Sequence, residues 1–123
     1  MEMNKIYNRR QFAKDLERRT RDFAIRIIHL SIKLPNTPEG RVIKNQITKS
    51  GTSIGANYRE ANRSRSKADF RNRIGICESE ASETQYWMEI IEGMKWLNQE
   101  QLKPDYDECI ELLALFTSIG KKL

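Results

Sequence analysis

The chain has 123 residues, a net charge of +5 and 32% charged residues. This length fits one domain, and many Glu, Lys, Arg, Leu and Ile with only three prolines favour helix over strand. No run approaches the roughly 20 apolar residues that span a bilayer, and segment 1–10 lacks the apolar core of a signal peptide, so we expect a cytoplasmic protein without a membrane partner.

Apolar residues that recur every three or four positions predict four amphipathic helices. In chain order these helices cover residues 10–33, 38–62, 67–98 and 104–119. Residues 1–9 are expected to form a flexible N-terminus. Proline favours a helix end at Pro35 and new starts at Pro38 and Pro104, and the run 66–69 resembles a capping box. Short loops between such helices predict an all-α, antiparallel, up-down-up-down four-helix bundle that forms one domain, residues 1–123.

Small and polar residues dominate one face of the second predicted helix, where Gly51 and Gly55 lie one turn apart. Each interior glycine costs a helix about 1 kcal/mol relative to alanine. The favoured interpretation is therefore a neighbouring helix that approaches closely, with the polar groups bonded locally. A ligand pocket is the alternative. The third predicted helix is apolar over a broad arc in its second half, which indicates burial in the core alone or in the core and a subunit interface.

The sequence offers no constellation for catalysis or for metal binding. His29 is the only histidine, and Cys77 and Cys109 are expected to be buried free thiols. Glu80 and Glu83 share a helix face, but the Glu-x-x-His motif of di-iron bundles is absent, as is a glycine-rich phosphate loop. We therefore expect no enzymatic activity, no cofactor and no metal.

Charge is divided unevenly along the chain. Residues 1–73 carry 18 Lys and Arg against 7 Asp and Glu, a net charge of +11, whereas residues 74–123 have a net charge of −6. Cations crowd around the second loop at Arg59, Arg63, Arg65, Lys67, Arg71 and Arg73. Further cations on the first helix extend this set: Lys14, Arg18, Arg19 and Arg21.

Arginine pairs bidentately with phosphate, and a cluster of cations binds nucleic acid by releasing counterions. We predict that the six loop cations, with Arg18 and Arg19, bind RNA or DNA. We expect no stacking aromatics among these cations, so binding should be mostly to the phosphate backbone. Two alternatives stay open: a solvated charged surface, and a surface that docks on the acidic half of a neighbouring subunit.

The stretch QITKSGTSIGANYREA, residues 46–61, resembles the signature of the four-helix-bundle family known as 23S rRNA intervening-sequence protein. The match continues through residues 66–70 and on to Ile74, Ile76, Glu83, Tyr86 and Trp87. Ala61 stands where family members often have Gly, and Gly55 where many have Pro, but neither change breaks the helix. The motif positions expected to have a structural role are Gln46, Ser50, Ser53, Asn57, Glu60, Asp69, Phe70 and Glu83.

The resemblance implies a four-helix bundle whose relatives assemble into pentameric rings, and some members are encoded within insertions in large-subunit ribosomal RNA genes. A similar bundle, the accessory variability determinant of diversity-generating retroelements, is a basic pentamer that binds nucleic acid and a reverse transcriptase. We therefore expect a homo-oligomeric, pentameric accessory protein that binds nucleic acid, RNA before DNA. The alternative is an oligomeric scaffold whose basic and acidic faces bind protein partners or drive self-assembly.

Overall fold

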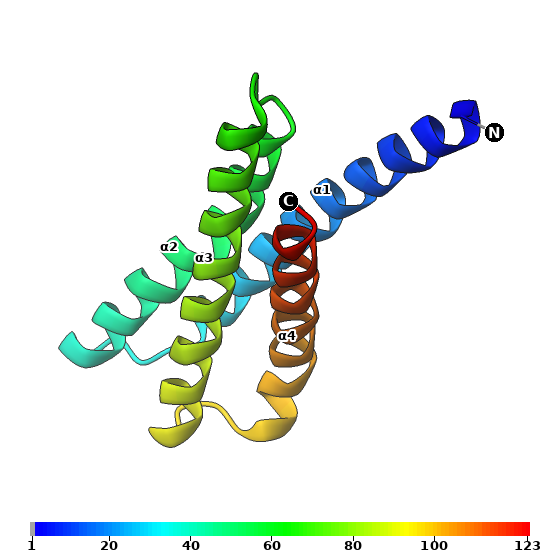
Figure 1. Cartoon of the computed structure of the whole chain (residues 1–123). Coiled ribbons are helices and arrows are strands. Elements are labelled where there is room, and N and C mark those ends of the chain that lie inside the picture. The colour runs from blue at the N-terminus through cyan, green and yellow to red at the C-terminus, as the bar shows by residue number, and fades with distance from the viewer. Residues whose placement is uncertain (1) are drawn as a thin grey trace.

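The computed structural model describes residues 2–123, with side chains from residue 8 onward. In this part of the chain there are four helices and no strands: α1 (Glu2–Ile32), α2 (Pro38–Ala61), α3 (Lys67–Gly93) and α4 (Gln99–Lys121). The helices run in alternating directions (Figure 1), and each packs on the next while α4 returns to α1. This arrangement confirms the up-down-up-down bundle. The assembly of bundles into a ring stays a prediction.

The contacts between helices are unequal. The interface of α2 with α3 is the most extensive, and that of α1 with α4 is the smallest. The N-terminal part of α1 reaches beyond the other three helices (Figure 1). The helix begins at Glu2 rather than at Arg10, but the side chains of residues 1–7 lie outside the described residues. The expectation of flexibility over residues 1–9 therefore stays a prediction.

Two helix starts follow the local signals in the sequence. The Thr37 side chain accepts a hydrogen bond of 3.1 Å from the backbone N–H of Gly40, and Pro38 occupies the first turn of α2. At the start of α3, the Ser66 side chain accepts a hydrogen bond of 3.1 Å from the backbone N–H of Asp69. Both caps confirm the predicted boundaries, because each satisfies an amide that the first helical turn leaves without a partner.

The boundary between the last two helices differs from the prediction. Helix α3 ends at Gly93 rather than at Asn98, and α4 begins at Gln99 rather than at Pro104. Lys95 has a positive φ of 59°, which turns the chain out of α3. Asn98 and Gln101 then form a complete capping box, with hydrogen bonds of 2.8 and 2.9 Å. Because this box starts the helix earlier, Pro104 lies inside α4.

The core draws fully buried side chains from all four helices: Phe23, Ile54, Met88 and Phe116 are examples. The two cysteines are free and buried, as predicted. The Cys77 thiol donates to the Ile54 carbonyl at 3.5 Å, and the Cys109 thiol donates to the Ala81 carbonyl at 3.2 Å. Burial raises the pKa of each thiol to about 12, so both groups stay protonated at neutral pH.

The two glycines of α2 face α1 at a close crossing. A Cβ atom added to Gly51 would lie 2.7 Å from Cγ2 of Ile27, and one added to Gly55 would lie 3.0 Å from Oγ1 of Thr20. Both distances are shorter than ordinary van der Waals contact. The glycines therefore let the two backbones approach, as the packing interpretation expects. An open pocket lined by Thr20, Thr52 and Gly55 borders the same face, so the alternative of a ligand pocket stays open.

Candidate nucleic-acid interface

The loop between α2 and α3 exposes three of the eight predicted nucleic-acid-binding residues. Arg63, Arg65 and Lys67 are all exposed, and the loop stands at one end of the bundle (Figure 1). Within the described part of the chain, none of these three forms an ion pair with a carboxylate. Their charge is therefore available to an external anion.

A fourth cation joins this loop from the far end of the chain. A shallow groove between the α2–α3 loop and the end of α4 is lined by Arg65, Lys67 and Lys122. Sequence order does not place Lys122 in the site, because 55 positions separate it from Lys67. The one available signal was the antiparallel order, which places the end of α4 toward the α2–α3 loop. We call Arg63, Arg65, Lys67 and Lys122 the basic tip.

Four other predicted cations are engaged with groups of the same chain. Arg18 pairs with Asp15 at 2.9 Å, and Arg59 lies 3.9 Å from a Glu17 carboxylate oxygen. Arg71 donates a hydrogen bond to the backbone carbonyl of Leu123. Arg73 is half-buried and donates to Oδ1 of Asn57 at 3.3 Å. Part of the hydrogen-bonding capacity of these four cations is therefore already used.

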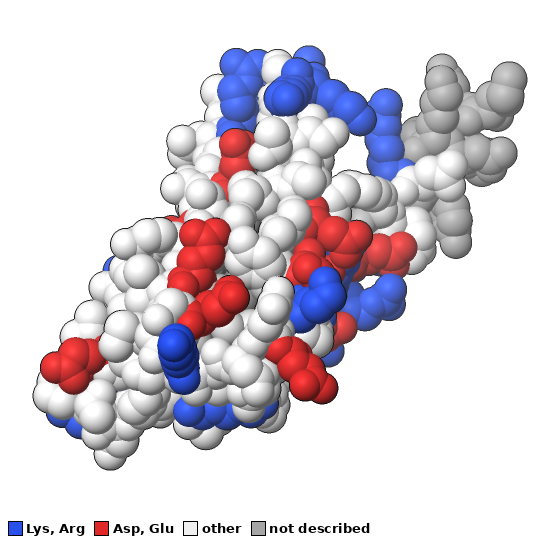
Figure 2. Space-filling model, turned by 90° about the horizontal axis from the view of Figure 1, so that it is seen from below, with Lys and Arg blue, Asp and Glu red and all other residues white. Residues whose placement is uncertain are grey.

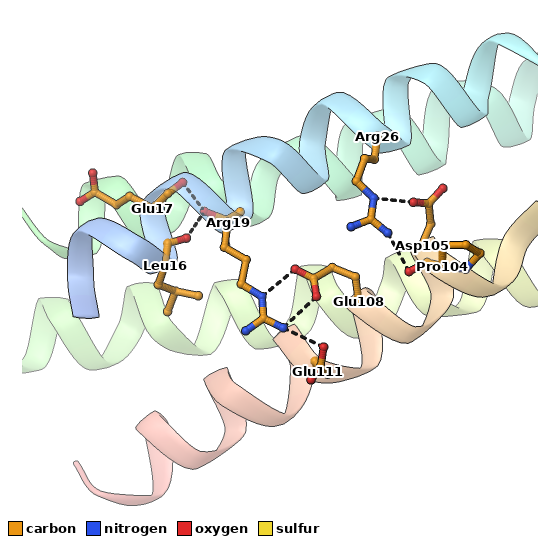
Figure 3. Close-up of polar contacts among 9 residues, drawn as sticks. Leu16, Glu17, Arg19, Arg26, Pro104, Asp105, Glu108 and Glu111 are labelled. Carbon is orange, nitrogen blue, oxygen red and sulfur yellow. Dashed lines mark hydrogen bonds and ion pairs between the residues drawn. The ribbon is translucent and has the colours of Figure 1, made fainter. Parts of the chain in front are cut away.

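Arg19 lies apart from the basic tip and joins α1 to α4 (Figure 3). It donates hydrogen bonds of 2.7 and 2.8 Å to Glu108 and a third of 2.8 Å to Glu111. About two turns further along α1, Arg26 donates to Asp105 at 2.7 Å. The hydrogen bond with Glu108 raises the pKa of Arg19. These contacts bring the basic first half of the chain onto the acidic second half within one bundle, and they occupy the Arg19 side chain that was predicted to bind nucleic acid.

Charge is also segregated on the surface of the folded chain. Figure 2 shows one group of Lys and Arg side chains along the upper edge of one face and others along its lower and right-hand margins, whereas Asp and Glu side chains lie mostly across its middle. On α3, a shallow groove is lined by Glu78, Glu83 and the exposed Tyr86. A polyanion therefore meets attraction at one edge of the molecule and repulsion on the face of α3.

Aromatic side chains lie beside the basic tip. A second groove at this end is lined by Phe12 from α1, Tyr58 from α2, Phe70 from α3 and Ile119 from α4. Phe70 also lines the groove that contains Arg65, so the two grooves adjoin. Phe12 is 48% exposed. The prediction that no stacking aromatics lie among the loop cations is therefore wrong: Tyr58 and Phe70 are neighbours of Arg59 and Arg71 in the sequence, and only Phe12 needs the fold to reach them.

The small polar residues of the family motif bond within the bundle. The buried Ser50 hydroxyl lies 2.8 Å from that of Thr84 on α3, and Thr84 also donates to its own helix. Asn57 donates to the Ser53 carbonyl at 2.9 Å, and Ser53 donates to the Lys49 carbonyl at 2.6 Å. These local bonds match the interpretation of this face as packing surface.

The remaining motif positions lie on the edges of the same helices. Glu83 accepts a hydrogen bond of 3.3 Å from Nε1 of Trp87, and Phe70 packs against the core. Gln46 is half-buried, whereas Glu60 and Asp69 are exposed. The motif therefore consists of packing residues together with exposed residues near the basic tip, and it does not converge on one cavity.

The described residues contain no group of three or more His, Cys, Asp or Glu side chains placed to hold a metal ion. His29 is exposed on α1. Burial, with the neighbouring Glu83 charge, raises the pKa of Glu80. From Glu2 onward, no helix has both the length and the apolar character needed to cross a membrane.

Comparisons with known proteins fit this architecture. Residues 14–118 match the family model described as 23S rRNA-intervening sequence protein. A crystal structure of a protein of unknown function from the S23 ribosomal protein family of Bacteroides thetaiotaomicron has 39% sequence identity and a TM-score of 0.80. The match covers 85% of this chain and 97% of that one. No curated protein matches this chain.

Proposed function

Because this chain belongs to the 23S rRNA-intervening sequence protein family, we propose that it binds RNA through the phosphates that its basic tip contacts. Its role is to bind rather than to catalyse. We propose RNA rather than DNA as the ligand because the family description refers to ribosomal RNA.

The observation that carries the proposal is the exposed and unpaired state of the loop cations. Within the described residues, most cations of α1 pair with neighbouring carboxylates, as Arg18, Arg19, Arg21 and Arg26 do. Arg63, Arg65 and Lys67 form no such pair with any carboxylate from residue 8 onward. Cations that remain unpaired keep their full attraction for phosphate, and each phosphate that they neutralise releases counterions.

The test is a pair of variants that remove the same charge from opposite ends of the bundle. The tip variant carries Arg63→Gln, Arg65→Gln and Lys67→Gln. Its control carries Lys33→Gln, Arg41→Gln and Lys95→Gln, which lie near the α1–α2 and α3–α4 loops. We expect the tip variant to bind a labelled structured RNA at least tenfold more weakly than the parent at low salt, with an unchanged melting temperature.

The control variant is expected to lose far less affinity, because its substitutions change only the net charge. If both variants lost the same affinity for RNA, binding would depend on the net charge of the chain and not on the basic tip. A tip variant that binds as tightly as the parent would overturn the site assignment.

The proposal includes assembly into a homo-oligomer, a pentamer as the family resemblance implies. Three large apolar residues on α1 support it, because Ile25, Ile28 and Ile32 recur at helical spacing and are 45%, 41% and 68% exposed. Such a stripe is typical of a subunit interface. Light scattering should give a mass of several chains for the parent, and Ile28→Glu should reduce it. A monomeric parent would contradict this part of the proposal.

A protein-binding scaffold is the alternative, favoured by the acidic groove of α3 beside Glu78 and Glu83. In that case the basic tip of one subunit docks on α3 of another. The Glu78→Gln/Glu83→Gln variant would then lose oligomer mass together with the tip variant. RNA binding without such a loss favours the nucleic-acid proposal.

A further inference from the structure

We propose that the apolar groove beside the basic tip receives an unpaired nucleobase of the bound RNA. This inference rests on the proposed function and specifies its substrate, a single-stranded or bulged segment rather than a continuous duplex. Binding to phosphate alone would not require the aromatic residues that the fold brings to this end.

The groove has the composition of a base-stacking site. Its walls include Phe12, Phe70 and Ile119, and its volume is about 350 Å³, within the range of small-molecule sites. Phe12 is 48% exposed, so much of its ring is free for contact. Every nucleobase has an aromatic face that stacks on such a ring, whatever the base sequence.

The cations stand where the phosphates of the same nucleotide would lie. Arg9 lines the apolar groove itself. Phe70 and Asn62 belong both to this groove and to the adjoining groove that contains Lys67. One ligand therefore meets an apolar wall and positive charge side by side. A nucleotide has this combination, an apolar face joined to an anionic backbone.

Duplex RNA presents its phosphates but keeps its bases stacked and paired. Sequence-tolerant recognition of single strands instead combines a cationic track with aromatic platforms. The groove at Phe12 and Phe70 adds such a platform to the basic tip. We therefore expect the chain to prefer unpaired RNA over a duplex of equal charge.

The experiment compares three labelled ligands of equal phosphate number: an oligouridine strand, an RNA duplex, and an abasic strand that has the backbone without bases. The variants are Phe12→Ala, Phe12→Leu and Phe12→Trp, with Tyr86→Ala as the matched control. Tyr86 is an aromatic residue that is 53% exposed on α3, away from this groove.

We expect Phe12→Ala and Phe12→Leu to weaken binding of oligouridine about tenfold, because each removes the stacking ring. Phe12→Trp and Tyr86→Ala should bind as the parent does, and duplex binding should not change in any variant. The parent should also bind the abasic strand about tenfold more weakly than oligouridine.

Equal binding of oligouridine and the abasic strand by the parent would overturn the base-binding inference without using any variant. Unchanged binding by Phe12→Leu would overturn it as well. In either case, the loss of affinity in the tip variant would still uphold the proposed phosphate binding. Tight binding of all ligands by the tip variant would overturn both proposals.

Discussion

Arg19 of α1 holds Glu108 of α4 through two hydrogen bonds of 2.7 and 2.8 Å, across 89 positions of sequence. The Glu108 side chain is 13% exposed, so water screens the contact less than it screens an ion pair on the open surface. This pair lies where α1 and α4 share their small interface. It joins the first helix to the last and closes the bundle.

We predict that Arg19→Ala lowers the free energy of unfolding by about 1–2 kcal/mol, because a bidentate charge-assisted contact is lost at a half-buried position. Arg18→Ala is the matched control, since Arg18 is 67% exposed and pairs only with Asp15 on its own helix. Its effect should stay within about 0.5 kcal/mol. Urea denaturation measures both, and equal effects would contradict a special role for Arg19.

Gly51 of α2 should not tolerate a methyl group, although alanine is the better helix former. An added Cβ would lie 2.7 Å from Ile27, and overpacking of this kind costs about 1–3 kcal/mol. Gly75 in α3 is the control, because no atom lies within 4 Å of its added Cβ. Gly75→Ala should stabilise the chain by about 0.5–1 kcal/mol. Thermal melts that move in the same direction for both variants would contradict the close crossing of α1 and α2.

Cys77 and Cys109 should resist thiol reagents in the folded chain. Burial raises the pKa of each from the ordinary 9.0 to about 12, and the thiolate is the reactive form. At pH 8, labelling should be far slower than for the chain unfolded in guanidinium. Native labelling at the unfolded rate would show that the thiols are accessible.

The same shift predicts a dependence of stability on pH. A raised pKa means that the folded chain keeps a proton that the unfolded chain loses above pH 9, so stability falls as the pH rises from about 9 to 12. A Cys77→Ala/Cys109→Ala variant should show a shallower decline over this window. Identical declines in the two proteins would contradict the assignment to the thiols.

The buried hydroxyls of Ser50 and Thr84, 2.8 Å apart, should be energetically coupled. Ser50→Ala and Thr84→Val each remove one partner and should lower the free energy of unfolding by about 1 kcal/mol. Each hydroxyl also bonds a carbonyl of its own helix, so the hydroxyl that remains in a single variant loses only the contact between the two hydroxyls, and the double variant should lose less than the sum of the single losses. Strict additivity in a double-mutant cycle would show that the hydrogen bond between Ser50 and Thr84 contributes nothing to the free energy of unfolding.

Local signals predicted much of the fold. Thr37 with Pro38, and Ser66, specify helix starts through contacts within three or four residues. At the α3–α4 boundary, Pro104 predicts a helix start five residues too late, because Asn98 and Gln101 already have the spacing of a capping box. Proline marks a first turn only when no stronger cap precedes it.

The candidate site was less accessible to sequence reasoning, because its members meet through tertiary structure. The run from Arg63 to Lys67 was visible as a charge cluster. The pairing of Arg19 with Glu108, and the approach of Phe12 and Lys122 to the loop, each depend on how distant helices pack. The charge count therefore identifies the basic surface around the α2–α3 loop. Only the fold shows which of its cations are paired with carboxylates and which are free.

The most direct test of the central claim is a salt titration of RNA binding by the parent and by the tip variant. If the basic tip contacts phosphates, the logarithm of the parent's binding constant falls linearly with the logarithm of salt concentration, and each phosphate adds a slope of about 0.7–0.9. Removing Arg63, Arg65 and Lys67 should then flatten the slope by about two. Equal slopes for the two proteins, or binding that ignores salt, would contradict phosphate recognition by the basic tip.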